Sequence, residues 1–170
     1  MRTLIFIIGG VVGLFALRRI TKKDIEQRFA ENLKQIRFDY GYDIARDVER
    51  IYRLETNNLK SKQFLDTYSA GMMAISKTFP YGWLTINRVY WSKYPQYKPV
   101  GVSTHEENKG LSGEGGGPKM FVKFGTLKAA MNTLAGFLRY YSNAGRWYSK
   151  NSNDQIEYKK ALNNIRTYFT

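Results

Sequence analysis

Residues 43–56 read DIARDVERIYRLET, and this stretch decides the fold prediction. Ile44, Val48 and Ile51 recur at the spacing of one face of an α-helix. Glu55 follows Ile44 by eleven residues, almost three full helical turns, so it extends the same stripe. We therefore predict a helix over about residues 43–56 that carries a carboxylate on its apolar face.

A carboxylate on an apolar helix face is a candidate catalytic group. Burial disfavours the ionised form, so we expect the pKa of Glu55 to be raised. A raised carboxyl pKa is what a general acid working near neutral pH requires. The structural alternative is that Glu55 pairs with Arg53 or a distant lysine, or turns into water where the helix ends.

Outward from this stretch, the sequence predicts an α+β fold that is mainly helical. A helix over residues 22–36 precedes a break at residues 39–41, and further helices are expected over residues 126–141 and 154–168. Thr126 is the expected N-cap of the first of these two. Residues 81–124 read as hairpins and loops that form a small irregular β-lobe. The expected apolar faces are Ile25, Phe29, Leu33 and Ile36, then Leu127, Ala130, Met131, Leu134, Leu138 and Tyr141, and finally Ile156, Leu162 and Ile165.

Residues 3–17, TLIFIIGGVVGLFAL, contain no charge and are flanked by basic residues. We predict a single-pass transmembrane helix within an anchor of residues 1–21, followed by one domain over residues 22–170. A secretory signal peptide is the alternative, but no small-x-small cleavage site precedes the basic cluster. The denser positive charge after the segment predicts a cytoplasmic domain.

Composition narrows the chemistry further. The chain has 170 residues, no cysteine and one histidine, so disulfide frameworks, thiolate metal sites and histidine-rich metal centres are excluded. The net charge of +13 predicts an anionic partner: nucleic acid, a membrane surface or a cell-wall polymer. With sixteen basic and six acidic residues, the segment after residue 55 carries most of this charge.

Residues 54–61, LETNNLKS, resemble a motif of the glucosaminidase family, the flagellar- and autolysin-type peptidoglycan hydrolases. In that motif a helix ends in Glu, and a Lys-Ser pair places Ser six residues later, as Ser61 follows Glu55. Residues 70–74, AGMMA, are similar to the next family element, and lytic transglycosylases share a Gly-Leu-Met element there. The later series of the family is similar to residues 121–124, 126–141, Trp147 and 158–162. The usual Asn pair is replaced by residues 67–69, and the usual Lys by Met73.

The resemblance implies a lysozyme-like domain with a groove between a helical and a β-rich lobe. Glu55 would then protonate the oxygen of a β-1,4 glycosidic bond in peptidoglycan glycan strands. No metal or cofactor is implied. Candidates for a second carboxylate are Asp66, Glu106, Glu107 and Glu114, each of which also reads as a solvated loop charge. Substrate-binding candidates are Ser61, Trp83, Trp91, Trp147 and Tyr158, for which helix capping or ordinary packing is the alternative.

A second hypothesis is a membrane-tethered basic binding or structural protein without catalysis, serving nucleic acid or virion assembly. Residues 88–94, RVYWSKY, interleave aromatic and basic side chains that could stack bases and contact phosphates. The enzyme hypothesis places the protein in the bacterial inner membrane or in the membrane of a lipid-containing phage virion. Glu55 discriminates between the two, because a nucleic-acid surface gains nothing from a buried carboxylate. The single histidine, His105, is expected to be exposed on a loop.

Overall fold

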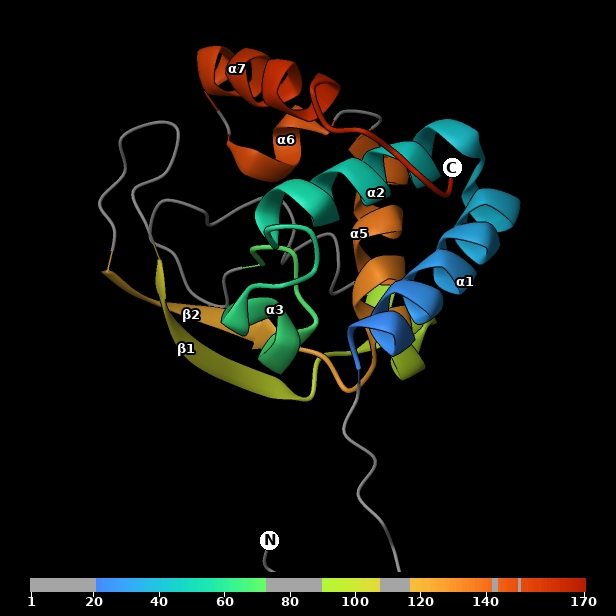
Figure 1. Ribbon diagram of the computed structural model, residues 1–170, viewed down its shortest axis with the longest axis vertical. Helices are drawn as coiled ribbons and strands as arrows, with labels where there is room; N and C mark the ends of the chain where they lie inside the picture. Colours follow the sequence, from blue (N-terminus) through green and yellow to red (C-terminus); the bar gives the residue numbers. More distant parts are fainter. Residues whose placement is uncertain (1–20, 73–89, 108–116, 142–143, 150) are drawn as a thin grey trace, which may run out of the picture.

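A computed structural model of the chain describes residues 21–72, 90–107, 117–141, 144–149 and 151–170. This part is a mainly helical α+β structure with a two-stranded antiparallel hairpin (Figure 1). Within it, no helix is both long and apolar enough to span a bilayer. The anchor predicted over residues 3–17 lies outside the described residues. The elements are α1 (Lys22–Tyr40), α2 (Tyr42–Glu55), α3 (Lys62–Thr67), η1 (Pro95–Tyr97), β1 (Gly101–Glu107), β2 (Gly117–Lys123), α5 (Leu127–Tyr141), α6 (Gly145–Tyr148) and α7 (Ser152–Asn163).

Helices α1 and α2 follow each other with one residue between them. A capping box begins α1: Thr21 Oγ1 accepts the Asp24 amide at 3.2 Å, and Asp24 Oδ2 accepts the Thr21 amide at 2.9 Å. The predicted face of α1 is buried, although the helix continues to Tyr40. Gly41 ends α1 at φ +95°, a conformation that favours glycine, and α2 begins at the next residue.

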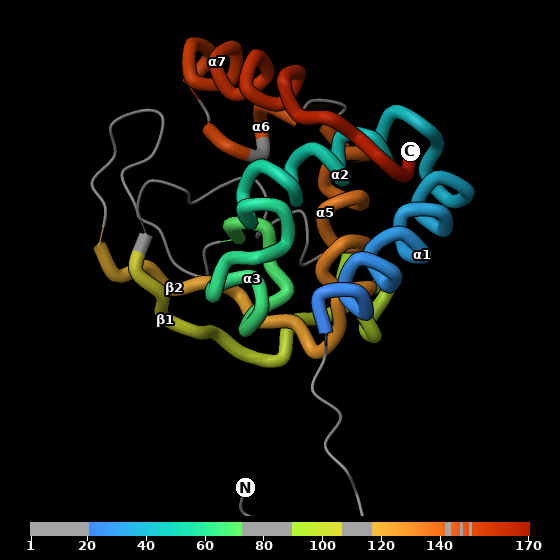
Figure 2. The backbone as a smooth tube through the Cα atoms, viewed as in Figure 1, coloured from blue at the N-terminus to red at the C-terminus, as the bar shows by residue number. Residues whose placement is uncertain are grey.

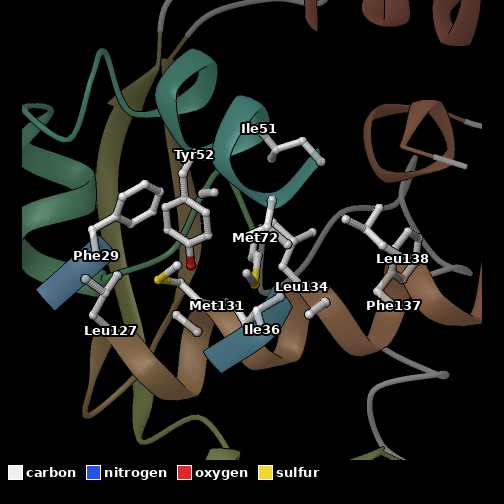
Figure 3. Close-up of a cluster of buried hydrophobic side chains, with 14 of the residues drawn as sticks. Phe29, Ile36, Ile51, Tyr52, Met72, Leu127, Met131, Leu134, Phe137 and Leu138 are labelled. Atoms are coloured by element: carbon white, nitrogen blue, oxygen red, sulfur yellow. The ribbon is translucent and has the colours of Figure 1, made fainter. Parts of the chain in front are cut away.

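The core is built around α5, which packs against both α1 and α2. Figure 3 shows Phe29 of α1, Tyr52 of α2 and Met72 converging on Met131 and its neighbours along α5. Ten residues of α5 are buried, and burial of each large apolar side chain contributes about 1.5–3 kcal/mol. The predicted N-cap of this helix is confirmed, since Thr126 Oγ1 accepts the Ala129 amide at 3.1 Å.

The hairpin is smaller than the sequence predicts. Strands β1 and β2 pair from Gly101↔Lys123 to Glu107↔Gly117. The free edge of β2 is joined to the chain that follows α3, because the Val122 amide donates to Met72 O at 2.8 Å and the Phe124 amide to Thr67 O at 3.0 Å. Residues 90–93 and η1 are helical turns, where hairpins and loops were predicted, and α3 was not predicted.

The C-terminal helix is shorter than predicted: α7 ends at Asn163 instead of residue 168. The reason lies in Glu49 of α2, a fully buried carboxylate. Its oxygens accept the Tyr168 amide at 2.7 Å and the Phe169 amide at 3.2 Å, whereas in a continued α7 these amides would donate to helix carbonyls four residues earlier. The predicted apolar face of this helix is also partly wrong, since Ile156 is 52% exposed. The buried side chains of α7 are Tyr158 and Leu162.

Glu49 also holds Arg53, whose Nε donates to Glu49 Oε1 at 2.9 Å. The Arg53 guanidinium lies over the rings of Phe29, Tyr168 and Phe169 at 4.6–5.5 Å. Arg53 is therefore bound to Glu49, and the alternative in which it pairs with Glu55 is not supported. Glu49 instead fixes the C-terminal segment to α2. Figure 2 shows this segment running back from α7 past α2.

We expect Glu49→Ala to lower the free energy of unfolding by about 3–5 kcal/mol, because two amides lose their acceptor and the buried Arg53 guanidinium keeps only the more distant Glu26 carboxylate, 3.6 Å away. Urea unfolding followed by circular dichroism measures the change. Glu157→Ala is the control, since the Glu157–Lys160 ion pair is exposed and should contribute less than about 1 kcal/mol. Equal losses in the two variants would contradict the structural role of Glu49.

Candidate functional site

Glu55 is the last residue of α2, and both of its carboxylate oxygens are close to other elements. The hydroxyl of Tyr158 on α7 donates to Glu55 Oε1 at 2.7 Å. The other oxygen, Oε2, lies over Gly71, where a Cβ atom would come within 3.1 Å of it. The side chain is partly buried. The carboxylate is therefore approached from two sides, in a residue that is partly buried as a whole.

Tyr158 is suited to be a permanent donor. It is fully buried, and its ring stacks on Tyr148 of α6 with centroids 4.6 Å apart and an interplanar angle of 7°. Burial raises the pKa of Tyr158 well above its usual value, and the nearby charge of Glu55 raises it further. The hydroxyl thus keeps its proton at any physiological pH, and it can donate to Glu55 throughout.

The turn after Glu55 is strained. Asn57, Asn58 and Leu59 have φ values of 49°, 53° and 63°, in the left-handed region. Asparagine tolerates this region, but for leucine such a conformation costs of order 1–3 kcal/mol. Thr56 holds the turn: its Oγ1 accepts the Leu59 amide at 2.9 Å, and its carbonyl accepts the Lys60 and Ser61 amides, each at 2.9 Å. The strain lies directly beside the candidate acid, as it often does at functional sites.

Ser61 has a structural role in this turn. Its hydroxyl accepts the Phe64 amide at 3.2 Å, so it is the N-cap of α3. Five residues, 56–60, separate Ser61 from Glu55 in the chain. The geometry accounts for the residue without a substrate contact.

Gly71 is fixed beneath the carboxylate by its neighbours. Ser69 Oγ accepts the Met72 amide at 2.8 Å, the Tyr52 hydroxyl donates to Tyr68 O at 3.1 Å, and Met72 O is bound to β2. Gly71 itself has φ +73°, which favours glycine. Glu55 therefore lies where the end of α2, helix α7 and the segment between α3 and residue 72 come together, and that segment borders β2.

The predicted aromatic binding residues are less informative. Trp91 is 9% exposed and its Nε1 donates to Thr133 Oγ1 at 3.0 Å, so it packs against α5. Trp83 lies outside the described residues. Trp147 belongs to α6, but its side chain is not described. Of the predicted substrate-binding residues, only Tyr158 is shown in contact with Glu55.

Asp66 is the best defined of the candidates for a second carboxylate. Lys123 Nζ lies 2.6 Å from its Oδ1, and Ser103 Oγ and His105 Nε2 contact its Oδ2, the latter at 3.0 Å. The Lys123 hydrogen bond, followed by those from Ser103 and His105, holds the pKa of Asp66 well below its usual range. Asp66 is thus an ionised anchor that ties α3 to the hairpin.

Two other expectations change with this cluster. His105 was expected on an exposed loop, but it lies in β1, is partly buried and contacts Asp66. Glu106 is exposed on β1, and Glu107 ends that strand with its side chain not described. Glu114 lies outside the described residues. Within the described ranges, no three His, Asp or Glu side chains gather closely enough to hold a metal ion.

Sequence inspection missed two features of the site. Tyr148, which supports Tyr158, has no sequence signal beyond its aromatic character. The left-handed turn was foreshadowed by the pair Asn57-Asn58, because asparagine is the non-glycine residue most tolerant of this conformation.

We expect Gly71→Ala to displace the Glu55 carboxylate and to destabilise the fold. Gly41→Ala is a matched control, since Gly41 also has a positive φ but nothing lies within 4 Å of its Cβ position. Both substitutions should lower the free energy of unfolding by about 1–2 kcal/mol through backbone strain. Gly71→Ala should lower it further, because its Cβ also crowds Glu55 Oε2. In a Glu55→Ala background the excess destabilisation should disappear. Urea unfolding of the wild type, the three single variants and the two double variants measures it. An excess that persists without the Glu55 side chain would refute the contact.

Asp66 predicts a pH dependence of stability. Because its folded-state pKa is depressed, its contribution is complete above the unfolded value of about 3.9 and is lost as the pH falls below it. The difference in unfolding free energy between the wild type and Asp66→Asn should therefore be largest at neutral pH and shrink toward about pH 3. Asp39→Asn, at an exposed position, is the control. A difference that is the same at every pH would contradict the ionised anchor.

Comparison with protein-family models, curated proteins and solved structures gave no match. The function must therefore be argued from the chemistry around Glu55.

Proposed function

We propose that the chain is a membrane-anchored enzyme that cleaves the β-1,4 glycosidic bonds of peptidoglycan glycan strands, with Glu55 as the general acid. One observation carries the proposal. Glu55, Gly71 and Tyr158 belong to three separate elements of the glucosaminidase-like series, and they meet at one carboxylate. The residues of that series were chosen from sequence alone, so their convergence supports the resemblance.

The arrangement suits acid catalysis on a glycosidic oxygen. In the proposed step the Glu55 carboxyl proton passes to the leaving oxygen while the bond from that oxygen to the anomeric carbon breaks. Either water or the 6-hydroxyl of the same sugar then bonds to the anomeric carbon, and the proton that it loses returns to Glu55. The first route gives hydrolysis and the second gives a 1,6-anhydro end. The Tyr158 hydroxyl contacts Oε1, so it would orient the carboxyl group in both halves of the reaction.

Asp66 is a weak candidate for the nucleophile. Lys123, Ser103 and His105 already occupy both of its oxygens. Attack on an anomeric carbon would require breaking these contacts. The same contacts stabilise the ionised carboxylate and so lower the pKa of Asp66. We infer that the positive charge developing on the sugar is stabilised by the substrate's own N-acetyl group, by Glu106 or Glu107 of β1, or by Glu114, which lies outside the described residues.

The proposal extends to the fold and the location. A lysozyme-like domain would place Glu55 between a helical and a β-rich part. The contact of Glu55 with Gly71, whose neighbour Met72 is hydrogen-bonded to β2, supports this proposal. Residues 3–17 would hold the enzyme in a bacterial inner membrane or in the membrane of a lipid-containing phage virion. Because the charge bias predicts a cytoplasmic domain, the first location requires insertion against that bias, and in the second the enzyme would meet peptidoglycan only on entry or at lysis. The net charge of +13 suits an anionic cell wall.

The test is digestion of purified peptidoglycan by the full chain in detergent, with product masses as the readout. We expect Glu55→Gln to lower the rate by about 100-fold or more, the usual contribution of a positioned general acid. Tyr158→Phe keeps the stacked ring but loses the hydroxyl, so it should lower kcat more than it raises KM. Glu157→Gln, on the exposed side of the same helix, should leave the rate unchanged. Failure of the wild type on walls of several chemotypes, or equal activity of Glu55→Gln, would refute the proposal.

A further inference from the structure

Three arginines lie over tyrosine rings near the ends of helices. The arginines belong to α1, α5 and α6, and the tyrosines belong to α2, α1 and α5. Arg37 lies 5.3 Å from the ring centroid of Tyr42, and Arg139 lies 5.8 Å from that of Tyr40. The same geometry recurs farther along the chain, with the Arg146 guanidinium 5.3 Å from the centroid of Tyr141. We call these six residues, with the adjacent Tyr140, the arginine–tyrosine surface: Arg37, Tyr40, Tyr42, Arg139, Tyr140, Tyr141 and Arg146.

This surface is open to an anionic partner. All three arginines are exposed, and within the described residues no carboxylate forms an ion pair with them. The two nearby acids are already engaged: Asp39 accepts from Gln35 at 3.0 Å, and Asp43 pairs with Arg46 at 3.0 Å. Tyr140 is 69% exposed and Tyr42 is 46% exposed.

The chemistry of the surface favours carboxylates beside flat rings. A guanidinium that rests on an aromatic face is held in place, so less side-chain entropy is lost when its donors bind a ligand. Its planar fork matches a carboxylate with two parallel hydrogen bonds, whereas a lysine acts as a point charge. Peptidoglycan combines both groups, since its stem peptides end in carboxylates and its sugars present apolar ring faces.

The position of the surface agrees with such a partner. The anchor predicted over residues 3–17 precedes the first residue of α1, and the surface begins at the last turn of that helix. Nineteen helical residues separate the two ends by roughly 28 Å.

We propose that the arginine–tyrosine surface is a second binding site for peptidoglycan, which holds the stem-peptide carboxylates while Glu55 acts on the glycan. The inference rests on the proposed function, because it takes its ligand from the proposed substrate. The residues of the arginine–tyrosine surface are separate from those that contact Glu55. The binding site and the proposed catalytic function can therefore be refuted independently.

The experiment measures binding of the full chain in detergent to purified, insoluble peptidoglycan, in the Glu55→Gln background so that the wall is not digested. The test variant combines Arg37→Gln, Arg139→Gln and Arg146→Gln. The charge-matched control combines Lys98→Gln, Lys128→Gln and Lys159→Gln, three exposed lysines outside the surface. Circular dichroism and the melting temperature confirm that both triple variants fold.

We expect the arginine variant to bind at least about ten-fold more weakly and the lysine variant to stay within about two-fold of its parent, since bidentate pairs exceed simple charge contacts. Replacing the same arginines by lysine should recover only part of the affinity. Amidation of the wall carboxylates should weaken binding of the parent and leave the arginine variant unchanged.

Equal losses in the two triple variants would overturn the proposal, because general basic charge would then explain the binding. So would loss of single-stranded DNA binding in the arginine variant with wall binding intact, which would assign the surface to nucleic acid. If wild-type protein cleaves walls but the arginine variant binds them like its parent, this inference fails and the proposed function stands. If nothing is cleaved yet binding depends on the arginines, the proposed function fails and this inference stands.

Discussion

The hydrogen bond from the Tyr158 hydroxyl to Glu55 joins the end of α2 to a helix 103 residues later in the chain. Most of the surrounding structure keeps these two groups in place. Arg50 of α2 donates to Asn163 at the end of α7, at 3.2 Å, and Tyr148 stacks on the Tyr158 ring from the other side. Gly71 lies against the second oxygen of Glu55 and is fixed by the chain that borders β2. The site thus depends on contacts between segments that are distant in sequence.

Three carboxylates illustrate how environment assigns different roles to one chemical group. Glu49 is fully buried and has an arginine and two backbone amides as partners, so it serves stability. Asp66 is held ionised by Lys123 and two further donors, so it ties α3 to the hairpin. Glu55 differs from both. Its partner at Oε1 is a neutral hydroxyl, and part of the side chain stays accessible, which suits a group that gives and regains a proton.

The sequence predicted the regular helices well, because their apolar residues recur with the helical period. Helices α1 and α5 bury all or most of the predicted faces, whereas α2 buries Val48 and Ile51 and leaves Ile44 and Glu55 partly buried. The end of α7 was predicted wrongly because the tail residues bind Glu49, a partner that periodicity cannot reveal. The short helix α3 has too few residues to show a pattern. For the site, periodicity pointed to Glu55, whereas Tyr158 entered only through the family resemblance. Gly71 was visible in the sequence, but its approach to the carboxylate required the fold.

The central claim is that Glu55 donates a proton to the leaving oxygen, and substrates that differ in their need for that proton test it most directly. Cleavage by Glu55→Gln would be compared on glycan strands and on an oligosaccharide of N-acetylglucosamine with a 2,4-dinitrophenyl leaving group, which departs without protonation. We expect Glu55→Gln to lose glycan cleavage but to cleave the activated substrate at close to the wild-type rate. An equal loss on both substrates, in a folded variant, would contradict a role for Glu55 as the general acid.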